Sequence, residues 1–446
     1  MKVEIISREM IKPSSPTPIH LKDFKICLLD ELAPPSYAPI LLLYSSTDFV
    51  NENCFSAVAD KLKKSLSQTL VHFYPFSGKL KENLNSIDCN DEGALFLEAK
   101  VNVALSKIVK NPETNMLCQL FPFDPYDAAV DGEIRVTTGV QVNVFECGGV
   151  GIGVCVSHKI ADGATMASFI SSWASSATAT GSDDDHQAFS SPRLDSAMIF
   201  PPKGMDMMKH CNMVIRNEKI MTKRFEFDWK KLANLKANID ANGVSEKINP
   251  TRVEAVTALI WRSAMEVKRS ISEQDTIPCS IATHLVNIRE RMRPPLPGHS
   301  IGNLWRLAVA PYLEFKKDVK LQELVGLIRE SIRRIDNDYV TELQGEDGFE
   351  KGIEPLRELR ELALLGGEGV EVYTFSSLAR FPFYEIDFGL GKPVKVCTIT
   401  MPIRNCVTLI DTRFGDGIEA WVTLTENDMA KFECSQELLQ FVSAAT

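Results

Sequence analysis

The stretch from Val136 to Ser157 constrains the fold more than any other part of this 446-residue sequence. Apolar residues alternate from Val140 to Phe145 and again from Val150 to Ser157, as they do in β-strands. Cys147-Gly148-Gly149 separates the two segments and is typical of a turn. The second segment has valine and isoleucine on one face, and the other face holds only small residues: Gly151, Gly153, Cys155 and Ser157. The sequence therefore predicts a β-hairpin that ends next to a histidine, His158.

Other segments alternate between helical and strand patterns. Helices are predicted over Ser56–Leu70, from Ala161 onward and over Arg252–Val267, because their apolar residues recur at helical spacing. Strands are predicted over Val394–Val407 and Ile418–Leu424. Hairpin-linked strands are more evident than βαβ units. The sequence therefore predicts a mixed α/β protein rather than a doubly wound parallel sheet.

A chain of this length is too long for a single core, so two or more domains are expected. Polar or proline-rich breaks occur at Ser175–Gln187, Phe200–His210 and Gln344–Gly352, and the second is the best linker candidate. We predict an N-terminal domain over 1–199, a crossover linker over 200–220 and a C-terminal domain over 221–446.

Charge and composition exclude several classes of function. The net charge of −10 opposes binding to a phosphate backbone, so no nucleic-acid partner is expected. No apolar run is long enough to span a bilayer, and the N-terminus has no signal-peptide core, so a cytoplasmic protein is expected. The 11 cysteines are scattered without zinc-site spacing, which predicts reduced, mostly buried thiols and no bound metal.

The hairpin is followed by S-H-K-I-A-D-G, Ser157 to Gly163. A histidine between a strand and a helix is held rigidly and can accept a proton near neutral pH, so His158 is a candidate general base. Asp162 lies at the start of the predicted helix, where it could cap backbone N–H groups or pair with an arginine. Gly163 would let another backbone pass closely. On spacing alone, a structural histidine remains the more common explanation.

A rival motif is Gly298-His299-Ser300-Ile301-Gly302, which matches the G-x-S-x-G elbow of serine hydrolases. That elbow needs a strand before the serine and a helix after it. Here P-P-L-P precedes the motif, and the N-L-W-R-L-A-V-A that follows is strand-like. The context disfavours a hydrolase that uses Ser300.

Several motifs, in order along the chain, resemble those of the plant BAHD acyltransferase family. They are H-F-Y-P-F-S-G-K-L (72–80), the S-H-K-I-A-D-G region, L-V-N-I-R-E-R-M-R-P-P-L-P (285–297), I-G-N-L (301–304) and D-F-G-L-G-K-P (387–393). The resemblance covers nearly the whole chain and is greatest to the vinorine synthase-like branch of alkaloid and terpenoid O-acetyltransferases.

The resemblance implies a two-domain α/β fold similar to chloramphenicol acetyltransferase, with mixed sheets flanked by helices and a solvent channel between the domains. Part of about 370–400 would pack with the N-terminal domain. The implied enzyme is a monomer that has no permanently bound cofactor and uses acyl-CoA as co-substrate, and resemblance to this branch implies acetyl-CoA. His158 would deprotonate the hydroxyl of a small-molecule alcohol, which attacks the thioester directly without an acyl-enzyme.

The resemblance also implies roles for other residues. Asp162 would pair with Arg289, and Asp387 with its glycines Gly389 and Gly391 would hold structure away from the chemistry. Contacts to acyl-CoA are expected from Thr251, Arg252, Asn303 and Lys392.

Two tryptophans of the family pattern are leucines here, Leu378 and Leu390. Replacing indole by isobutyl removes area and an N–H donor. A neutral repacking is slightly favoured over an enlarged substrate pocket. A protein of this fold that binds a metabolite without turnover stays open as a non-enzymatic alternative. The acceptor itself is not readable from the sequence, because fold does not fix substrate.

Overall fold

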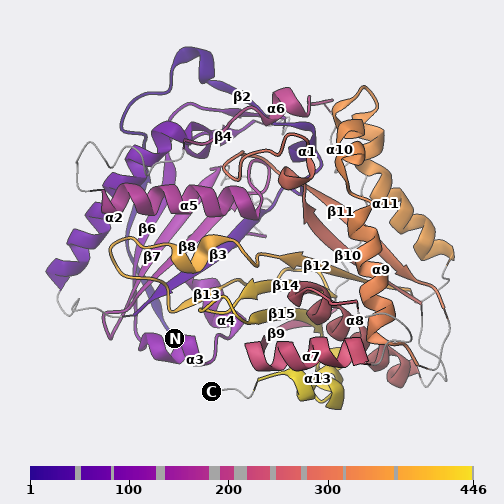
Figure 1. Ribbon diagram of the computed structural model, residues 1–446. Helices are drawn as coiled ribbons and strands as arrows, with labels where there is room; N and C mark the ends of the chain where they lie inside the picture. Colours follow the sequence, from indigo (N-terminus) through magenta and orange to yellow (C-terminus); the bar gives the residue numbers. More distant parts are fainter. Residues whose placement is uncertain are drawn as a thin grey trace. The chain divides into compact units, whose positions relative to one another are not determined.

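The computed structural model describes residues 1–45, 52–81, 85–126, 136–179, 191–204, 218–241, 248–272, 279–314, 318–365 and 370–443 (Figure 1). Its contacts divide into two compact units, which are described separately. The first unit comprises Met1–Met213, Leu296–Leu304 and Phe381–Ile399, and the second comprises Val214–Pro295, Trp305–Arg380 and Thr400–Thr446. The sequence-based division had placed 296–304 in the C-terminal domain. Most of the predicted linker, and 180–187 of the predicted polar loop, lie outside the described residues.

The first unit contains a six-stranded mixed sheet in the order β1-β6-β7-β8-β3-β13. Its strands are β1 (Val3–Ile11), β3 (Tyr37–Tyr44), β6 (Ala94–Val101), β7 (Thr138–Phe145), β8 (Val150–Ser157) and β13 (Lys395–Cys397). A small sheet joins β2 (Asp23–Lys25), β4 (Lys79–Leu80) and β5 (Ser86–Asp88). The α-helices are α1 (Leu28–Glu31), α2 (Glu52–His72), α3 (Leu105–Lys110), α4 (Thr114–Leu117), α5 (Gly163–Thr178) and α6 (Ser196–Ile199). The 3₁₀ turns are η1 (Ile19–Leu21), η2 (Tyr74–Ser77), η3 (Cys118–Leu120) and η7 (Pro382–Glu385).

The predicted hairpin is confirmed: β7 and β8 pair antiparallel, and Val144 lies opposite Val150. All eight residues of β8 are buried, because the strand lies inside the sheet between β7 and β3. The small face of β8 allows η3 to pack closely on it. A Cβ atom at Gly153 would lie 2.2 Å from the carbonyl oxygen of Leu120.

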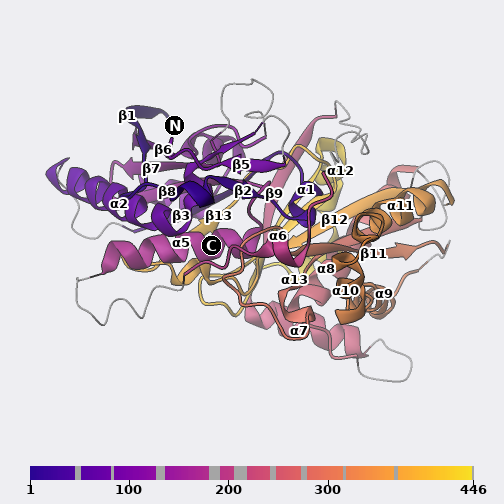
Figure 2. The ribbon, with the colours of Figure 1, turned by 90° about the horizontal axis from the view of Figure 1, so that it is seen from above.

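Helices α2 and α5 lie side by side on one face of this sheet (Figures 1 and 2). The indole N–H of Trp173 on α5 donates to the carbonyl oxygen of Leu62 on α2 at 3.1 Å. Phe169 of α5 stacks on Phe76 with ring centroids 4.7 Å apart, and Phe73 meets both rings edge-on. These contacts anchor α5, and therefore the segment that joins it to β8.

The second unit is built on another six-stranded mixed sheet, in the order β11-β10-β12-β14-β15-β9. Its strands are β9 (Ile220–Phe227), β10 (Ser280–Asn287), β11 (Trp305–Tyr312), β12 (Glu371–Ser377), β14 (Cys406–Asp411) and β15 (Ile418–Thr425). The helices are α7 (Trp229–Ala241), α8 (Arg252–Ser272), η6 (Arg289–Arg291), α9 (Leu321–Arg333), α10 (Asn337–Gln344), α11 (Gly348–Leu365), α12 (Glu426–Phe432) and α13 (Gln436–Phe441). The core lies between the sheet and α8, where Trp261 is fully buried and its N–H donates to Ser280 Oγ at 2.8 Å.

The mixed α/β class is confirmed, with parallel pairs only at β6–β7, β10–β12 and β12–β14 among the strands of the described residues. The single strand predicted over Val394–Val407 is wrong: it divides into β13 of the first unit and β14 of the second. Pro402 lacks a backbone N–H for a sheet ladder, and Asn405 has a left-handed backbone with φ of 57°.

Nine cysteines have described side chains, and all nine are free thiols, as predicted. Six are buried, whereas Cys118, Cys147 and Cys434 are exposed. No group of three His, Cys, Asp or Glu side chains that could hold a metal occurs within the described ranges. None of the helices in those ranges is long and apolar enough to cross a membrane.

A buried histidine, His284, makes the stability of the second unit depend on pH. His284 of β10 stacks on Phe375 of β12, with centroids 6.0 Å apart and planes 15° from parallel. Burial lowers the pKa of His284 from 6.5 to about 4. The unfolded chain therefore binds a proton that the folded chain does not, and stability falls as the pH drops from 6.5 toward 4.

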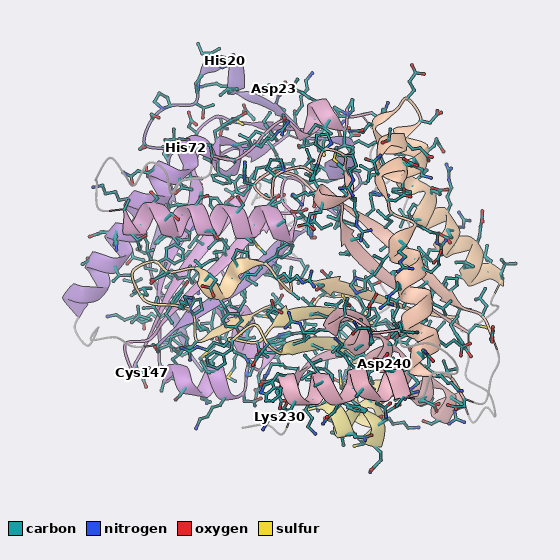
Figure 3. The ribbon with its side chains drawn as sticks, viewed as in Figure 1. His20, Asp23, His72, Cys147, Lys230 and Asp240 are labelled. Atoms are coloured by element: carbon teal, nitrogen blue, oxygen red, sulfur yellow. The ribbon has the colours of Figure 1, made fainter. Side chains whose placement is uncertain are left out.

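We expect this histidine to account for a loss of about 2 kcal/mol in the free energy of unfolding between pH 7 and pH 5. Urea denaturation at the two pH values, monitored by tryptophan fluorescence, measures the loss. His284→Gln should make the difference between the two pH values smaller by that amount. His20→Gln is the control, because His20 is exposed and points outward (Figure 3). An unchanged pH difference in His284→Gln would contradict the assignment.

Candidate active site

His158 is the first residue after β8, and the hairpin fixes its backbone. The N–H of Ser157 donates to the carbonyl of Thr137, and the N–H of His158 donates to the carbonyl of Ser36, both at 2.8 Å. The side chain of His158 remains partly exposed. A partly exposed histidine on a rigid backbone meets the geometric need of a general base.

The ring of His158 is oriented by Asn303. His158 Nδ1 lies 2.8 Å from Asn303 Oδ1, and Asn303 Nδ2 donates to the carbonyl oxygen of His158 at 2.5 Å. Asn303 Nδ2 also donates to Oδ1 of Asp30 at 2.8 Å. Asn303 is 1% exposed, so its amide is enclosed within the first unit. Its expected contact with acyl-CoA is therefore not supported by the geometry; the amide serves His158 instead.

The protonation of His158 suits a base. Burial lowers the pKa of His158 below its ordinary value of 6.5, and the hydrogen bond with Asn303 and the carboxylates of Asp162 and Asp30 oppose part of the shift. The ring is therefore mainly neutral at pH 7 and has a lone pair available.

Asp162 organises the segment around the histidine. It is the N-cap of α5, and its Oδ1 accepts the N–H of Thr165 at 2.8 Å, which confirms the predicted cap. Its Oδ2 accepts the N–H of Leu304 at 3.1 Å. Thr165 Oγ1 and the backbone of Gly302 exchange two hydrogen bonds of 3.1 Å. These hydrogen bonds hold residues 301–304 against the start of α5. They thereby position Asn303 next to His158.

The predicted pairing of Asp162 with Arg289 joins residues of different units, so it stays a prediction. Arg289 is buried in η6 of the second unit, and its side chain contacts Asn287 Oδ1 at 3.2 Å. Gly163 is the first residue of α5.

The D-F-G-L-G segment forms a turn in the first unit. Oδ1 of Asp387 accepts the N–H groups of Gly389 at 2.7 Å and Gly391 at 2.9 Å, and both glycines have positive φ, 85° and 78°. This geometry supports a structural role for the three residues. Lys392 is exposed and pairs with Glu385.

Leu390 is buried in the first unit, and Leu378 is partly buried in the second. Their shared role in a substrate pocket concerns both units and stays a prediction.

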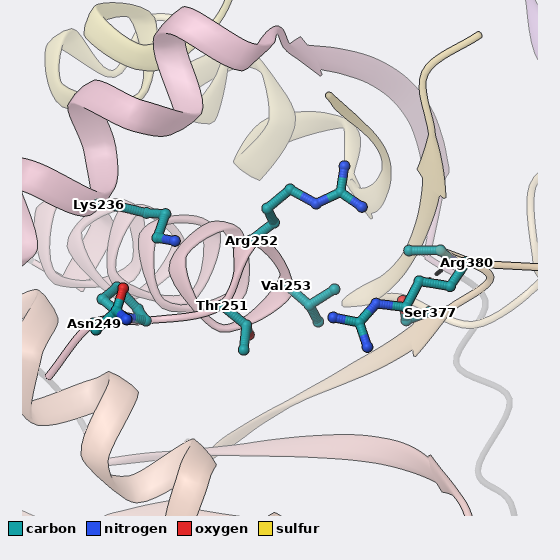
Figure 4. A pocket seen from close by; sticks show the side chains of 9 residues that line it. Lys236, Asn249, Thr251, Arg252, Val253, Ser377 and Arg380 are labelled. Atoms are coloured by element: carbon teal, nitrogen blue, oxygen red, sulfur yellow. Dashed lines mark hydrogen bonds between the residues drawn. The ribbon is translucent and has the colours of Figure 1, made fainter. Parts of the chain in front are cut away.

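The second unit contains a cavity of about 500 Å³ at the start of α8 (Figure 4). Its lining includes the two predicted residues Thr251 and Arg252, together with Lys236 and Arg380. Thr251 Oγ1 accepts the N–H of Glu254 at 3.1 Å, while Glu254 accepts the N–H of Thr251 at 2.8 Å. This reciprocal capping box starts α8 at the rim of the cavity.

The guanidinium of Arg252 is occupied by protein groups. It donates to Oδ1 of Asp411 at 3.2 Å and to the carbonyl of Gly415 at 2.5 Å. By contrast, the side chains of Lys236 and Arg380 have no hydrogen bond or ion pair with any described residue, and Figure 4 shows them reaching in from opposite sides. The sequence analysis missed both, although Arg380 lies only two residues after Leu378, which it had considered.

The surroundings of Ser300 do not form a nucleophile elbow. Ser300 is buried, its N–H donates to the carbonyl of Pro297 at 3.0 Å, and it forms an isolated bridge with Arg193. Within described residues 279–314, the next regular element is strand β11 and not a helix. The structure therefore gives no support to the hydrolase alternative.

Comparison with known proteins assigns the family. The sequence profile of the Transferase family matches residues 1–439. The chain belongs to this family, the BAHD acyltransferases. It is 39% identical to stemmadenine O-acetyltransferase of Catharanthus roseus over 433 residues, which is 96% of each chain. It is 38% identical to limonoid 1-O-acetyltransferase of Citrus sinensis, over 100% of this chain and 99% of the relative.

The fold agrees with that of a solved family member. The crystal structure of vinorine synthase superposes with a TM-score of 0.80 at 34% identity, and 99% of each chain is covered. The predicted BAHD fold and acyltransferase class are thereby confirmed, as is the similarity to alkaloid and terpenoid acetyltransferases.

Proposed function

We propose that this BAHD acyltransferase transfers an acetyl group from acetyl-CoA to a hydroxyl group of a plant alkaloid or terpenoid, with His158 as the general base. The named activities of its relatives support the acetyl donor and the acceptor class. The observation that carries the proposal is the geometry of His158, whose Nδ1 is held by Asn303 while its ring remains neutral and partly exposed.

The reaction needs only one proton acceptor. Nε2 of His158 takes the proton of the acceptor hydroxyl as its oxygen attacks the thioester carbonyl. The tetrahedral intermediate then collapses, the C–S bond breaks, and the CoA thiolate leaves. The imidazolium returns its proton to the thiolate, so the enzyme ends unchanged and no acyl-enzyme forms.

The cavity at the start of α8 is proposed to bind phosphate groups of acetyl-CoA. A phosphate is recognised by lysine and arginine side chains that are not already neutralised. Lys236 and Arg380 fit this requirement, whereas Arg252 is held by Asp411. The predicted donor contact of Thr251 is retained, because its exposed side chain lines the same cavity. That of Lys392 stays a prediction without such support.

We expect Lys236→Ala and Arg380→Ala each to raise the KM for acetyl-CoA about tenfold with little change in kcat, because each removes one charged hydrogen bond to a phosphate. Initial rates of thiol release over a range of acetyl-CoA concentrations measure both constants. Lys230→Ala is the control, because Lys230 is an exposed lysine of the same helix that lies over the ring of Trp229. Unchanged KM values for acetyl-CoA in both variants would contradict the proposal that this cavity binds the phosphate groups of acetyl-CoA.

A binding protein without turnover is the remaining alternative. Tight binding of a metabolite with no consumption of any acyl-CoA across a panel of donors would favour it. Release of CoA that depends on an added alcohol and on His158 would exclude it.

A further inference from the structure

Asp30 of α1 is a buried acid that neither the sequence patterns nor the proposed reaction uses. It is 1% exposed, and both of its oxygens accept hydrogen bonds. Oδ2 accepts the N–H of Cys27 at 2.9 Å. Oδ1 accepts two donors of Asn303, the backbone N–H at 2.7 Å and Nδ2 at 2.8 Å. Because backbone N–H groups can only donate, both oxygens of Asp30 must act as acceptors.

The bonds to Asp30 determine which way the amide of Asn303 faces. Its Nδ2 lies against two oxygens, the carboxylate of Asp30 and the carbonyl of His158. Exchanging the amide oxygen and nitrogen would place Oδ1 against those two acceptors, with no hydrogen between them. The amide is therefore fixed with its NH₂ group toward Asp30 and its oxygen toward His158.

The orientation of the amide in turn determines the proton position on His158. Asn303 Oδ1 is an acceptor, so Nδ1 of His158 at 2.8 Å must carry the hydrogen. A neutral imidazole has only one N–H, so the lone pair lies on Nε2. The direction of each bond is thus set by the one before it, from Asp30 through Asn303 to His158.

We propose that Asp30 is a positioning residue for the acyl transfer: through Asn303 it holds neutral His158 with its proton on Nδ1 and its lone pair on Nε2. This inference rests on the proposed role of His158 as the base. During the reaction the Nδ1 proton stays in place, and only the Nε2 proton is gained from the acceptor and returned to the CoA thiolate. Asp30 touches neither substrate nor reacting atoms.

The proton position is measurable on the free enzyme. In protein labelled with ¹⁵N-histidine, two-dimensional ¹H–¹⁵N spectra distinguish a ring protonated on Nδ1 from one protonated on Nε2. The His158 signals are those that disappear in His158→Ala. The wild-type spectrum should show the Nδ1–H form. A wild-type ring protonated on Nε2 would overturn the proposal without any variant of Asp30.

Asp30→Asn tests the part played by the carboxylate. The new NH₂ group must face an N–H donor, either that of Cys27 or those of Asn303, which weakens or removes the bond from Asp30. Only the carbonyl of His158 then holds the NH₂ group of Asn303 in full, so the amide is less firmly oriented. We expect a mixture of His158 tautomers and a fall in kcat of about tenfold or more, with the KM for acetyl-CoA unchanged. If this variant does not fold, Asp30→Ser is used instead, because it removes the carboxylate without adding an NH₂ group. Its His158 tautomer and kcat are then compared with those of the wild type.

Glu31→Gln is the matched control. Glu31 is the next residue of α1, is equally buried at 1% exposed, and accepts the N–H groups of Lys203 and Gly204 at 2.9 and 2.8 Å. It should keep the wild-type tautomer and kcat. If the Asp30 variant matches this control in both, the positioning role is refuted. Full turnover in His158→Ala would instead refute the base assignment and leave the tautomer result standing.

Discussion

Replacing His158 by alanine is expected to lower kcat with acetyl-CoA by about 10²- to 10⁴-fold, the range that a positioned general base contributes. The ring would be lost from the end of β8, where its Nδ1 is hydrogen-bonded to Asn303 Oδ1. The acceptor hydroxyl would then have to lose its proton to water. The variant should still fold, because the His158 side chain is only partly buried and the backbone bond to Ser36 remains.

The rates are measured as thiol release together with the mass of the acetylated alcohol. His72→Ala is the control, because His72 is an exposed histidine at the end of α2 (Figure 3). Its rates should equal those of the wild type. A His158→Ala enzyme within a few-fold of the wild type would show that S-H-K-I-A-D-G is only scaffold.

Gly153→Ala is expected to destabilise the first unit by about 3 kcal/mol or more. The new methyl group would lie 2.2 Å from the carbonyl oxygen of Leu120 and 3.3 Å from the ring of Phe121. Neither can move away easily, because β8 is buried inside the sheet and the backbone of η3 packs on it. Urea denaturation followed by circular dichroism measures the effect.

Gly326→Ala is the matched control for this change. Gly326 lies exposed in the middle of α9, and a Cβ atom there would meet no other atom within 4 Å. Alanine favours helices, so this variant should be more stable by about 0.5–1 kcal/mol. Equal stabilities of the two variants would contradict the close packing of η3 on β8.

Local sequence patterns correctly predicted the secondary structure on either side of His158. The hairpin of β7 and β8 followed from alternation, a glycine turn and a face of small residues, all visible within about twenty neighbouring positions. Asp162 as the cap of α5 followed from its place before a run of helical spacing. Such features depend on residues that are close in sequence, so they could be predicted from the sequence alone.

The partners of His158 could not be predicted in this way. Asp30 and Asn303 are 273 positions apart, and only the folded first unit brings them together. Asn303 was therefore expected to contact acyl-CoA, a role that its family motif implied. Asp30 is followed directly by a second acid, Glu31, and no sequence pattern singled it out.

The availability of charged residues is also hard to predict from sequence, because their partners are distant. Arg252 was expected at the donor, but Asp411, 159 positions away, holds its guanidinium. Lys236 of α7 carries no motif, and only the cavity reveals it together with Arg380. A charge is available for a ligand only if the fold leaves it unpaired, and that depends on tertiary contacts.

Incubation of the purified enzyme with acetyl-CoA and a panel of alkaloid and terpenoid alcohols tests the central claim most directly. Free thiol and the mass of each alcohol are followed together, in wild type and in His158→Ala. We predict that one class of alcohol gains a single acetyl group, with one thiol released per ester formed, and that the alanine variant is slower by at least about 10²-fold. Equal ester formation by both proteins, or thiol release without any ester, would contradict acetyl transfer with His158 as the base.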